Sequence, residues 1–136
     1  MSAAALRTTL AVLAVAALGV TAVAGAGTTQ WRKDRVRDRV APTAPANLHA
    51  TGATASSVGV AWDPSTDNVG VTGYRIERCT GASCTSFAQI ATTSGATTFT
   101  NTGLTGATAY RYRVRATDAA GNLSGYSNIA TATTTA

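Results

Sequence analysis

The chain has 136 residues and a formal net charge of +5, although only 12% of its residues are charged. This length accommodates one small domain, which leaves little room for a deep catalytic cleft. Residues 31–39 carry five basic side chains against two acidic ones, whereas residues 43–136 carry five arginines against four acidic side chains. The positive charge therefore belongs mainly to a short segment before the domain and does not indicate nucleic-acid binding.

The first 26 residues are predicted to be a signal peptide with a helical hydrophobic part. Arg7 precedes an uncharged run from Leu10 to Val23, and Ala24-Gly25-Ala26 offers a small-x-small cleavage pattern, so we expect cleavage after Ala26. The alternative is an uncleaved membrane anchor, because residues 8–30 carry no charge and are long enough to span a bilayer. The basic residues that follow are also unusual on the exported side of a membrane. The abundance of Ala, Gly and Thr in the run weakens its insertion and favours the cleaved signal.

Residues 27–42 are predicted to be a basic linker. They are polar and charged and show no sustained core-facing pattern, as in a solvated tether; the alternative is electrostatic contact with cell-wall polyanions or lipid headgroups. Pro42 and Pro45 end this segment, because proline removes a backbone donor and keeps its predecessor extended. We therefore expect the folded domain to span residues 43–136.

The domain is predicted to be all-β, because apolar and polar residues alternate in short runs and no sustained helical period follows residue 40. In the first strand we expect Leu48 and Ala50 to point inward. The strands are expected at residues 47–51, 57–62, 73–79, 87–91, 97–100, 109–117 and 127–133. The inward residues expected to form the structural core are Leu48, Val60, Trp62, Tyr74, Ile76, Leu104, Tyr110, Tyr112 and Val114.

Several motifs follow one another along these strands. They are Pro45-x-Asn47-Leu48, Val58-x-Val60-x-Trp62, Gly73-Tyr74-Arg75-Ile76, Leu104-x5-Tyr110-x-Tyr112-x-Val114-x-Ala116, Asp118-x-x-Gly121-Asn122 and Ser124-x-x-Ser127. In this order, over residues 43–134, they resemble a fibronectin type III domain. The run Asp67-Asn68-Val69-Gly70-Val71-Thr72-Gly73-Tyr74 resembles the bacterial, secreted type of this domain. The resemblance implies an immunoglobulin-like, seven-stranded β-sandwich in which Tyr110 forms a tyrosine corner. It also implies a role as a spacer or surface-adhering unit beside extracellular polysaccharide-degrading enzymes.

The two cysteines of the chain, Cys79 and Cys84, are predicted to form a disulfide that stiffens a hairpin tip. A zinc site would need four ligands, and His49 is the only histidine. A redox pair usually has two intervening residues, whereas four separate these cysteines. The disulfide remains the favoured interpretation in an exported protein.

We predict no catalytic, cofactor-binding or metal-binding residue, and no cofactor. Asp63, Asp67 and Asn68 are expected to share one loop and are candidate calcium ligands, but their spacing lacks the alternating oxygens of a calcium loop and favours a turn. His49 has no recognisable nucleophile motif near it, and paired carboxylates occur only within that loop.

One surface patch is a candidate for binding a partner. Arg111, Arg113 and Arg115 form a row on the outward face of a strand, with Arg75 expected on the neighbouring strand. The plainer interpretation is an ordinary solvated face in which Glu77 reduces the positive charge.

Three functions fit these observations. The first is a secreted, non-catalytic interaction or spacer module, with extracellular or cell-wall polysaccharide, or another secreted protein, as partner. The second is a cell-surface structural protein retained by residues 8–30, which would be the only case of membrane contact. The third is direct carbohydrate binding, with Tyr126 or Phe87 as stacking rings.

Overall fold

The computed structural model describes residues 37–136, of which Asp38–Ala136 form a compact unit. The predicted signal peptide, the alternative membrane anchor and the first part of the predicted linker lie outside the described residues. Within residues 37–136, no helix is long and apolar enough to cross a membrane. Residues 38–42, which fall in the predicted linker, belong to the compact unit.

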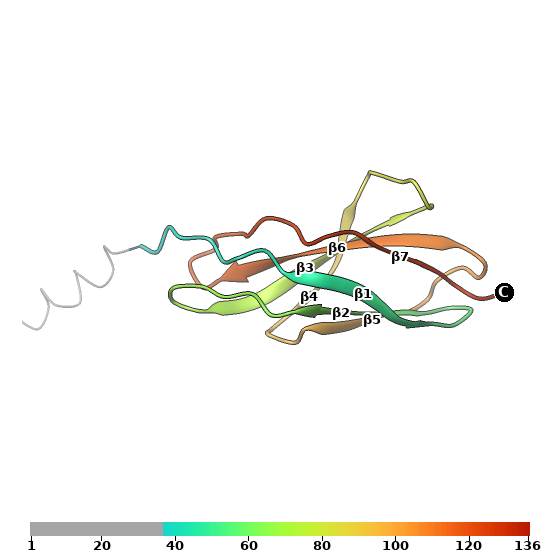
Figure 1. The fold of residues 1–136 in the computed structure, drawn as a ribbon, viewed down its shortest axis with the longest axis horizontal. Helices are drawn as coiled ribbons and strands as arrows, with labels where there is room; N and C mark the ends of the chain where they lie inside the picture. Colours follow the sequence, from blue (N-terminus) through green and yellow to red (C-terminus); the bar gives the residue numbers. More distant parts are fainter. Residues whose placement is uncertain (1–36) are drawn as a thin grey trace, which may run out of the picture. The chain divides into compact units, whose positions relative to one another are not determined.

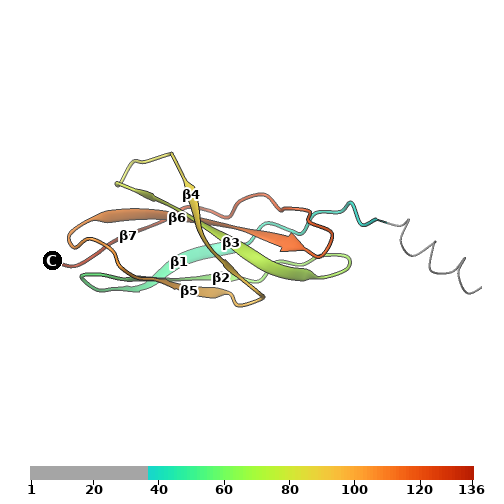
Figure 2. The same ribbon diagram turned by 180° about the vertical axis from the view of Figure 1, so that it is seen from behind.

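The domain is a two-layered β-sandwich (Figures 1 and 2), which confirms the predicted all-β, immunoglobulin-like fold class. A three-stranded sheet in the order β1-β2-β5 packs against a four-stranded sheet in the order β4-β3-β6-β7, and all neighbouring strands are antiparallel. The seven strands are β1 (Ala46–Ala53), β2 (Val58–Asp63), β3 (Val71–Thr80), β4 (Ala88–Thr93), β5 (Thr98–Asn101), β6 (Ala109–Asp118) and β7 (Ala130–Thr133).

The core lies between the two sheets, because every second residue of β2 and β6 points inward. Trp62 is only 4% exposed, and its ring meets that of Tyr74 edge to face, with the centroids 5.3 Å apart. Burial on this inward face rules out Trp62 as an exposed platform for a sugar ring. The structure places all of the residues expected in the core among its buried side chains: Leu48, Val60, Trp62, Tyr74, Ile76, Leu104, Tyr110, Tyr112 and Val114.

The corner before β6 has the hydrogen bond that the resemblance implied. The backbone N–H of Thr105 donates to the Tyr110 hydroxyl at 3.0 Å, beside the buried side chain of Leu104. Both residues therefore hold the loop between β5 and β6 against the end of the sandwich.

Most strand ends differ from the expected ones by one or two residues, and two differences are larger. Ala50 was expected to be inward, but it is exposed, since it lies on the edge strand β1 beside an irregularity in the pairing with β2. The last strand begins at Ala130 and not at residue 127. In the segment before β7, the Ser124 hydroxyl accepts a hydrogen bond from the N–H of Ala116, and the Ser127 hydroxyl accepts one from the N–H of Val114. Serine side chains thus take the place of the backbone carbonyls that a regular strand would offer to β6.

Candidate functional site: an arginine and aromatic face

The candidate patch lies on the outer face of the four-stranded sheet. In the antiparallel register, Arg113 of β6 is opposite Glu77 of β3, and Arg115 is opposite Arg75. Opposed residues of an antiparallel pair project to the same side, so the arginine row and Glu77 share one surface. Arg111, Arg113 and Arg115 are each half-buried.

Two aromatic side chains from outside the strands complete this surface. Phe87 comes immediately before β4, and Tyr126 lies in the connection between β6 and β7. The guanidinium carbon of Arg113 is 4.4 Å from the ring centroid of Phe87 and 3.7 Å from that of Tyr126. Arg115 is 4.9 Å from the Tyr126 ring, and Arg111 is 5.9 Å from the Phe87 ring. These distances are those of cation–π contacts, and together they make an arginine–aromatic face.

Glu77 is the acidic centre of the arginine–aromatic face. Its side chain is only 7% exposed and accepts hydrogen bonds from Arg113 Nε at 2.9 Å, Arg113 Nη2 at 2.7 Å and the Tyr126 hydroxyl at 2.7 Å. Both Arg113 bonds go to Oε1, and the Tyr126 bond goes to Oε2. Arg115 Nε lies 3.9 Å from Oε2. Burial by itself raises the pKa of Glu77, but the bonds from Tyr126 and Arg113 and the charges of Arg113 and Arg115 outweigh it and hold the pKa below its ordinary value.

The same contact acts on Tyr126. Its hydrogen bond to Glu77, together with burial and the negative charge of Glu77, raises the pKa of the phenol. Tyr126 therefore stays protonated and remains a donor to Glu77 at neutral pH. Because Glu77 restrains both Arg113 and Tyr126, the face is held in a defined arrangement while 38% of Tyr126 remains exposed.

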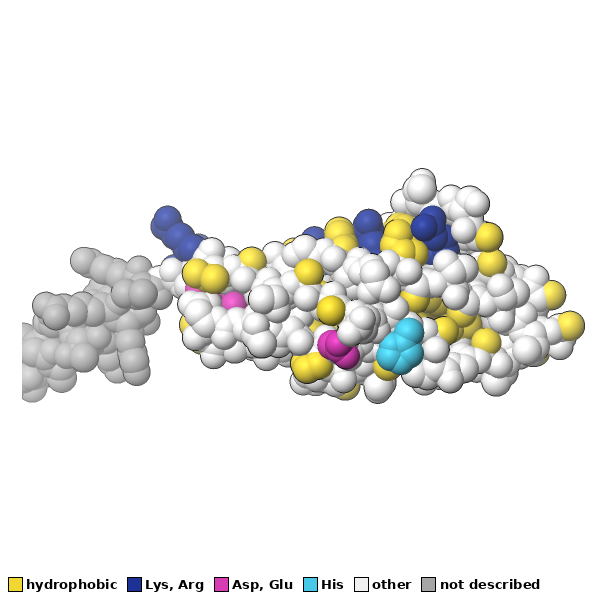
Figure 3. Space-filling model, in the orientation of Figure 1, with side chains coloured by type: hydrophobic (Ala, Val, Ile, Leu, Met, Phe, Trp, Pro, Cys, Tyr) yellow, Lys and Arg dark blue, Asp and Glu magenta, His cyan; other side chains and the backbone are white. Residues whose placement is uncertain are grey.

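The structure thus brings together residues that the sequence indicated separately. Arg111, Arg113 and Arg115 lie with Phe87 and Tyr126. Arg75 is opposite Arg115 but makes no ion pair or cation–π contact with the described residues. In Figure 3, arginine side chains lie beside hydrophobic ones beneath the loop that connects β3 and β4.

Cys79 and Cys84 are joined by a disulfide across this loop, with their Cα atoms 6.0 Å apart. Gly81 lies in this loop with a backbone φ of 114°, a conformation that residues other than glycine rarely adopt. Arg111 Nη1 donates a hydrogen bond to the carbonyl of Cys84. The clipped loop is therefore attached to one end of the arginine–aromatic face.

Asp63, which ends β2, and Asp67, in the β2–β3 loop, do not form one cluster. Asp63 accepts a hydrogen bond from Asn47, whereas Asp67 caps the turn by accepting the N–H groups of Val69 and Gly70 at 3.1 and 2.9 Å. His49 is exposed, with Nδ1 2.7 Å from the carbonyl oxygen of Asn47.

The sequence predicted paired carboxylates only in the segment that holds Asp63 and Asp67, and this prediction is wrong. Asp67 instead lies near Asp38 and Asp118, which belong to two other segments of the chain. No local spacing in the sequence indicates this grouping, because it depends on loops that meet only after the sandwich has formed.

Comparison with known proteins identifies the family. The model of the fibronectin type III domain matches residues 43–133. The chain is 52% identical over 101 residues to an alpha-amylase of Niallia circulans, an alignment that covers 74% of this chain but 7% of the amylase. It is 48% identical over 99 residues to chitinase A1 of the same organism (73% and 13% covered), and 46% identical over 99 residues to exoglucanase B of Cellulomonas fimi (73% and 8% covered).

Solved structures agree with this assignment. Chitinase ChiA74 from Bacillus thuringiensis superposes with a TM-score of 0.60 at 34% identity, covering 72% of this chain and 14% of the chitinase chain. A Fn3-like protein from Clostridium thermocellum gives a TM-score of 0.57 at 27% identity, covering 68% and 92%. The chain therefore spans only a small part of these enzymes, and it belongs to the fibronectin type III family.

Proposed function

We propose that the protein is an exported, non-catalytic fibronectin type III module that serves extracellular polysaccharide-degrading enzymes. The observation that carries the proposal is the 52% identity to a segment that makes up only 7% of an alpha-amylase, with similar matches in a chitinase and an exoglucanase. A shared segment that accompanies enzymes for different polymers is expected to support them and not to set their chemistry.

Export is supported by two features of the chain. The N-terminal 26 residues have the pattern of a signal peptide, and the Cys79–Cys84 disulfide is of a kind that persists in oxidising compartments.

Mass spectrometry of the protein recovered from the medium of a bacterial host is expected to find an N-terminus at Gly27. Retention of residues 8–30 in a membrane fraction would instead support the alternative of an anchored cell-surface protein. The two outcomes differ by the mass of the first 26 residues, so one measurement separates them.

The arginine–aromatic face is the surface proposed to contact a polysaccharide. Aromatic rings stack on the apolar faces of sugars, and guanidinium groups donate hydrogen bonds to hydroxyl or carboxylate oxygens. Tyr126 is the most exposed aromatic ring of the face, and Arg113 and Arg115 lie against it.

We expect the protein to be retained on at least one of insoluble chitin, cellulose and starch, and Tyr126→Ala to lower that retention several-fold. Depletion of protein from the supernatant over a range of polymer concentrations measures the effect. Val69→Ala is the matched control, because Val69 is 69% exposed and lies away from this face in the β2–β3 loop. Absence of retention on every polymer, or equal retention of the Tyr126→Ala protein, would contradict a polysaccharide contact on this face.

A further inference from the structure

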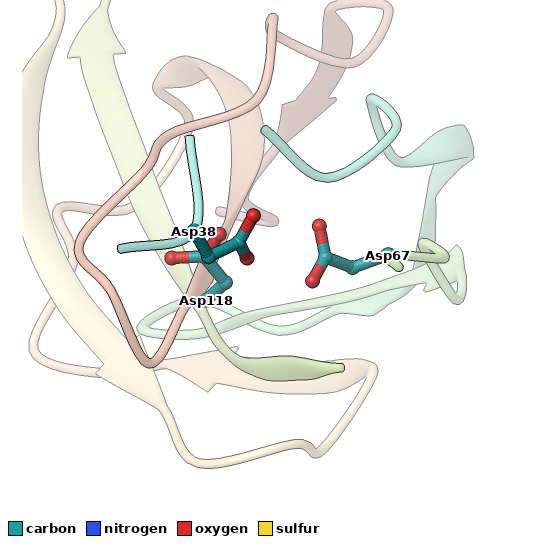
Figure 4. Close-up of side chains that lie close together, drawn as sticks. All are labelled: Asp38, Asp67 and Asp118. Carbon is teal, nitrogen blue, oxygen red and sulfur yellow. The ribbon is translucent and has the colours of Figure 1, made fainter. Parts of the chain in front are cut away.

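Three carboxylates from distant parts of the chain converge at one end of the sandwich (Figure 4). Asp38 begins the compact unit, Asp67 lies in the loop between β2 and β3, and Asp118 ends β6. One oxygen of each lies within 4.8 Å of the others. Figure 4 shows the carboxylate of Asp67 directed toward those of Asp38 and Asp118.

Two oxygens of this carboxylate cluster are buried without a partner. Asp38 Oδ2 and Asp67 Oδ1 each expose less than 1 Å² and form no hydrogen bond. The second oxygen of each carboxylate is occupied: Asp38 Oδ1 accepts the N–H of Val40 at 3.0 Å, and Asp67 Oδ2 accepts backbone N–H groups of its own turn. A buried carboxylate oxygen without a donor is costly and rare in folded proteins, so these two oxygens indicate a missing positive partner.

The described residues supply no such partner. The ion pairs among residues 37–136 join Glu77 to Arg113 and Arg115, on the outer face of the four-stranded sheet, and none involves Asp38, Asp67 or Asp118. Asp118 is only 4% exposed, and its two oxygens accept hydrogen bonds from Asn122, at 2.9 Å from the backbone and 2.8 Å from the side-chain amide. The three carboxylates thus lie close together, and the only hydrogen-bond donors to them among the described residues are uncharged.

A divalent cation with oxygen ligands removes both the repulsion and the unpaired oxygens. Magnesium demands a near-ideal octahedron and usually keeps several waters, whereas calcium accepts six to eight oxygens in irregular, loop-built surroundings. Three carboxylates contributed by a terminal segment and two loops fit the second description.

We propose that Asp38, Asp67 and Asp118 form a calcium-binding site. Such an ion would clamp the start of the domain onto the β2–β3 loop and the turn after β6. Asn122 already begins this clamp, because its side-chain amide donates to the carbonyls of Asp38 and Val40, both at 3.2 Å. The site goes beyond the proposed role with polysaccharides and does not depend on it.

Isothermal titration of the chelator-treated full-length protein with CaCl₂ is expected to show one binding event, with a dissociation constant of about 10⁻⁴–10⁻³ M, as in extracellular calcium modules. At that affinity, 10 mM CaCl₂ is expected to raise the melting temperature by about 5 °C or more over the protein in EDTA. MgCl₂ at the same concentration is expected to give a clearly smaller shift.

The variants Asp67→Asn and Asp38→Asn are expected to abolish the calcium-dependent shift. In EDTA they are expected to melt at or above the wild-type temperature, because each removes one negative charge while keeping the shape of the side chain. Asp63→Asn is the matched control: Asp63 ends β2 just before the loop that carries Asp67, is exposed, and its replacement is expected to keep the full shift. A wild-type melting temperature that is unchanged by calcium, an equal shift with magnesium, or a shift retained by Asp67→Asn would overturn the proposal.

Discussion

Replacement of Trp62 by alanine is expected to lower the free energy of unfolding by about 3–5 kcal/mol, the cost of truncating a large buried aromatic side chain. Trp62 lies between the sheets, is 4% exposed and packs edge to face on Tyr74. The loss would combine the hydrophobic transfer of the ring with a cavity that two rigid sheets cannot close. Urea unfolding followed by far-ultraviolet circular dichroism measures it.

Two further variants make this prediction specific. Trp62→Phe is expected to cost less than the alanine variant, because the indole Nε1 is buried without a hydrogen-bond partner and its removal breaks no polar contact. Val69→Ala, at an exposed position, is expected to change the free energy of unfolding by less than about 0.5 kcal/mol. A loss below about 1 kcal/mol in Trp62→Ala would show that the ring is not part of the core.

Replacement of Glu77 by glutamine is expected to destabilise the domain by about 2 kcal/mol at pH 7, because it removes the charge that the hydrogen bonds of Arg113 and Tyr126 stabilise. The effect is expected to depend on pH. The pKa of Glu77 in the folded protein is lowered, so the unfolded chain takes up this proton first as pH falls. The contribution of Glu77 is therefore fully present above its ordinary pKa of 4.5 and is lost as pH falls through the folded-state pKa.

The measurement is urea unfolding of the wild type and Glu77→Gln at a series of pH values from 7 to 3. The difference between the two proteins is expected to shrink below about pH 4.5. Asp63→Asn, which changes an exposed carboxylate, is expected to give a much smaller difference across the whole range. Parallel curves for wild type and Glu77→Gln would show that the ionised carboxylate does not hold the arginine–aromatic face together.

Much of the fold could be predicted because a strand has a period of two. The alternation of Tyr110, Tyr112 and Val114 with three arginines specified both faces of β6 before any tertiary contact was known. The same rule was wrong at Ala50, where an edge strand leaves an inward-patterned residue exposed. It was also wrong about the start of β7, because the serine side chains that replace backbone acceptors there follow no periodic pattern.

The sequence by itself determined that Arg111, Arg113 and Arg115 share one side of a sheet, since residues two apart on a strand always do. It also placed Glu77 near them, but only the tertiary structure decided that Phe87 and Tyr126 meet the arginines there. The same holds for Asp38, Asp67 and Asp118, which are brought together by the ends of different strands and loops. The alternation of side chains follows from the backbone geometry of a single strand. Contacts between distant segments depend instead on strand order and register, which are set only when the two sheets form and pack.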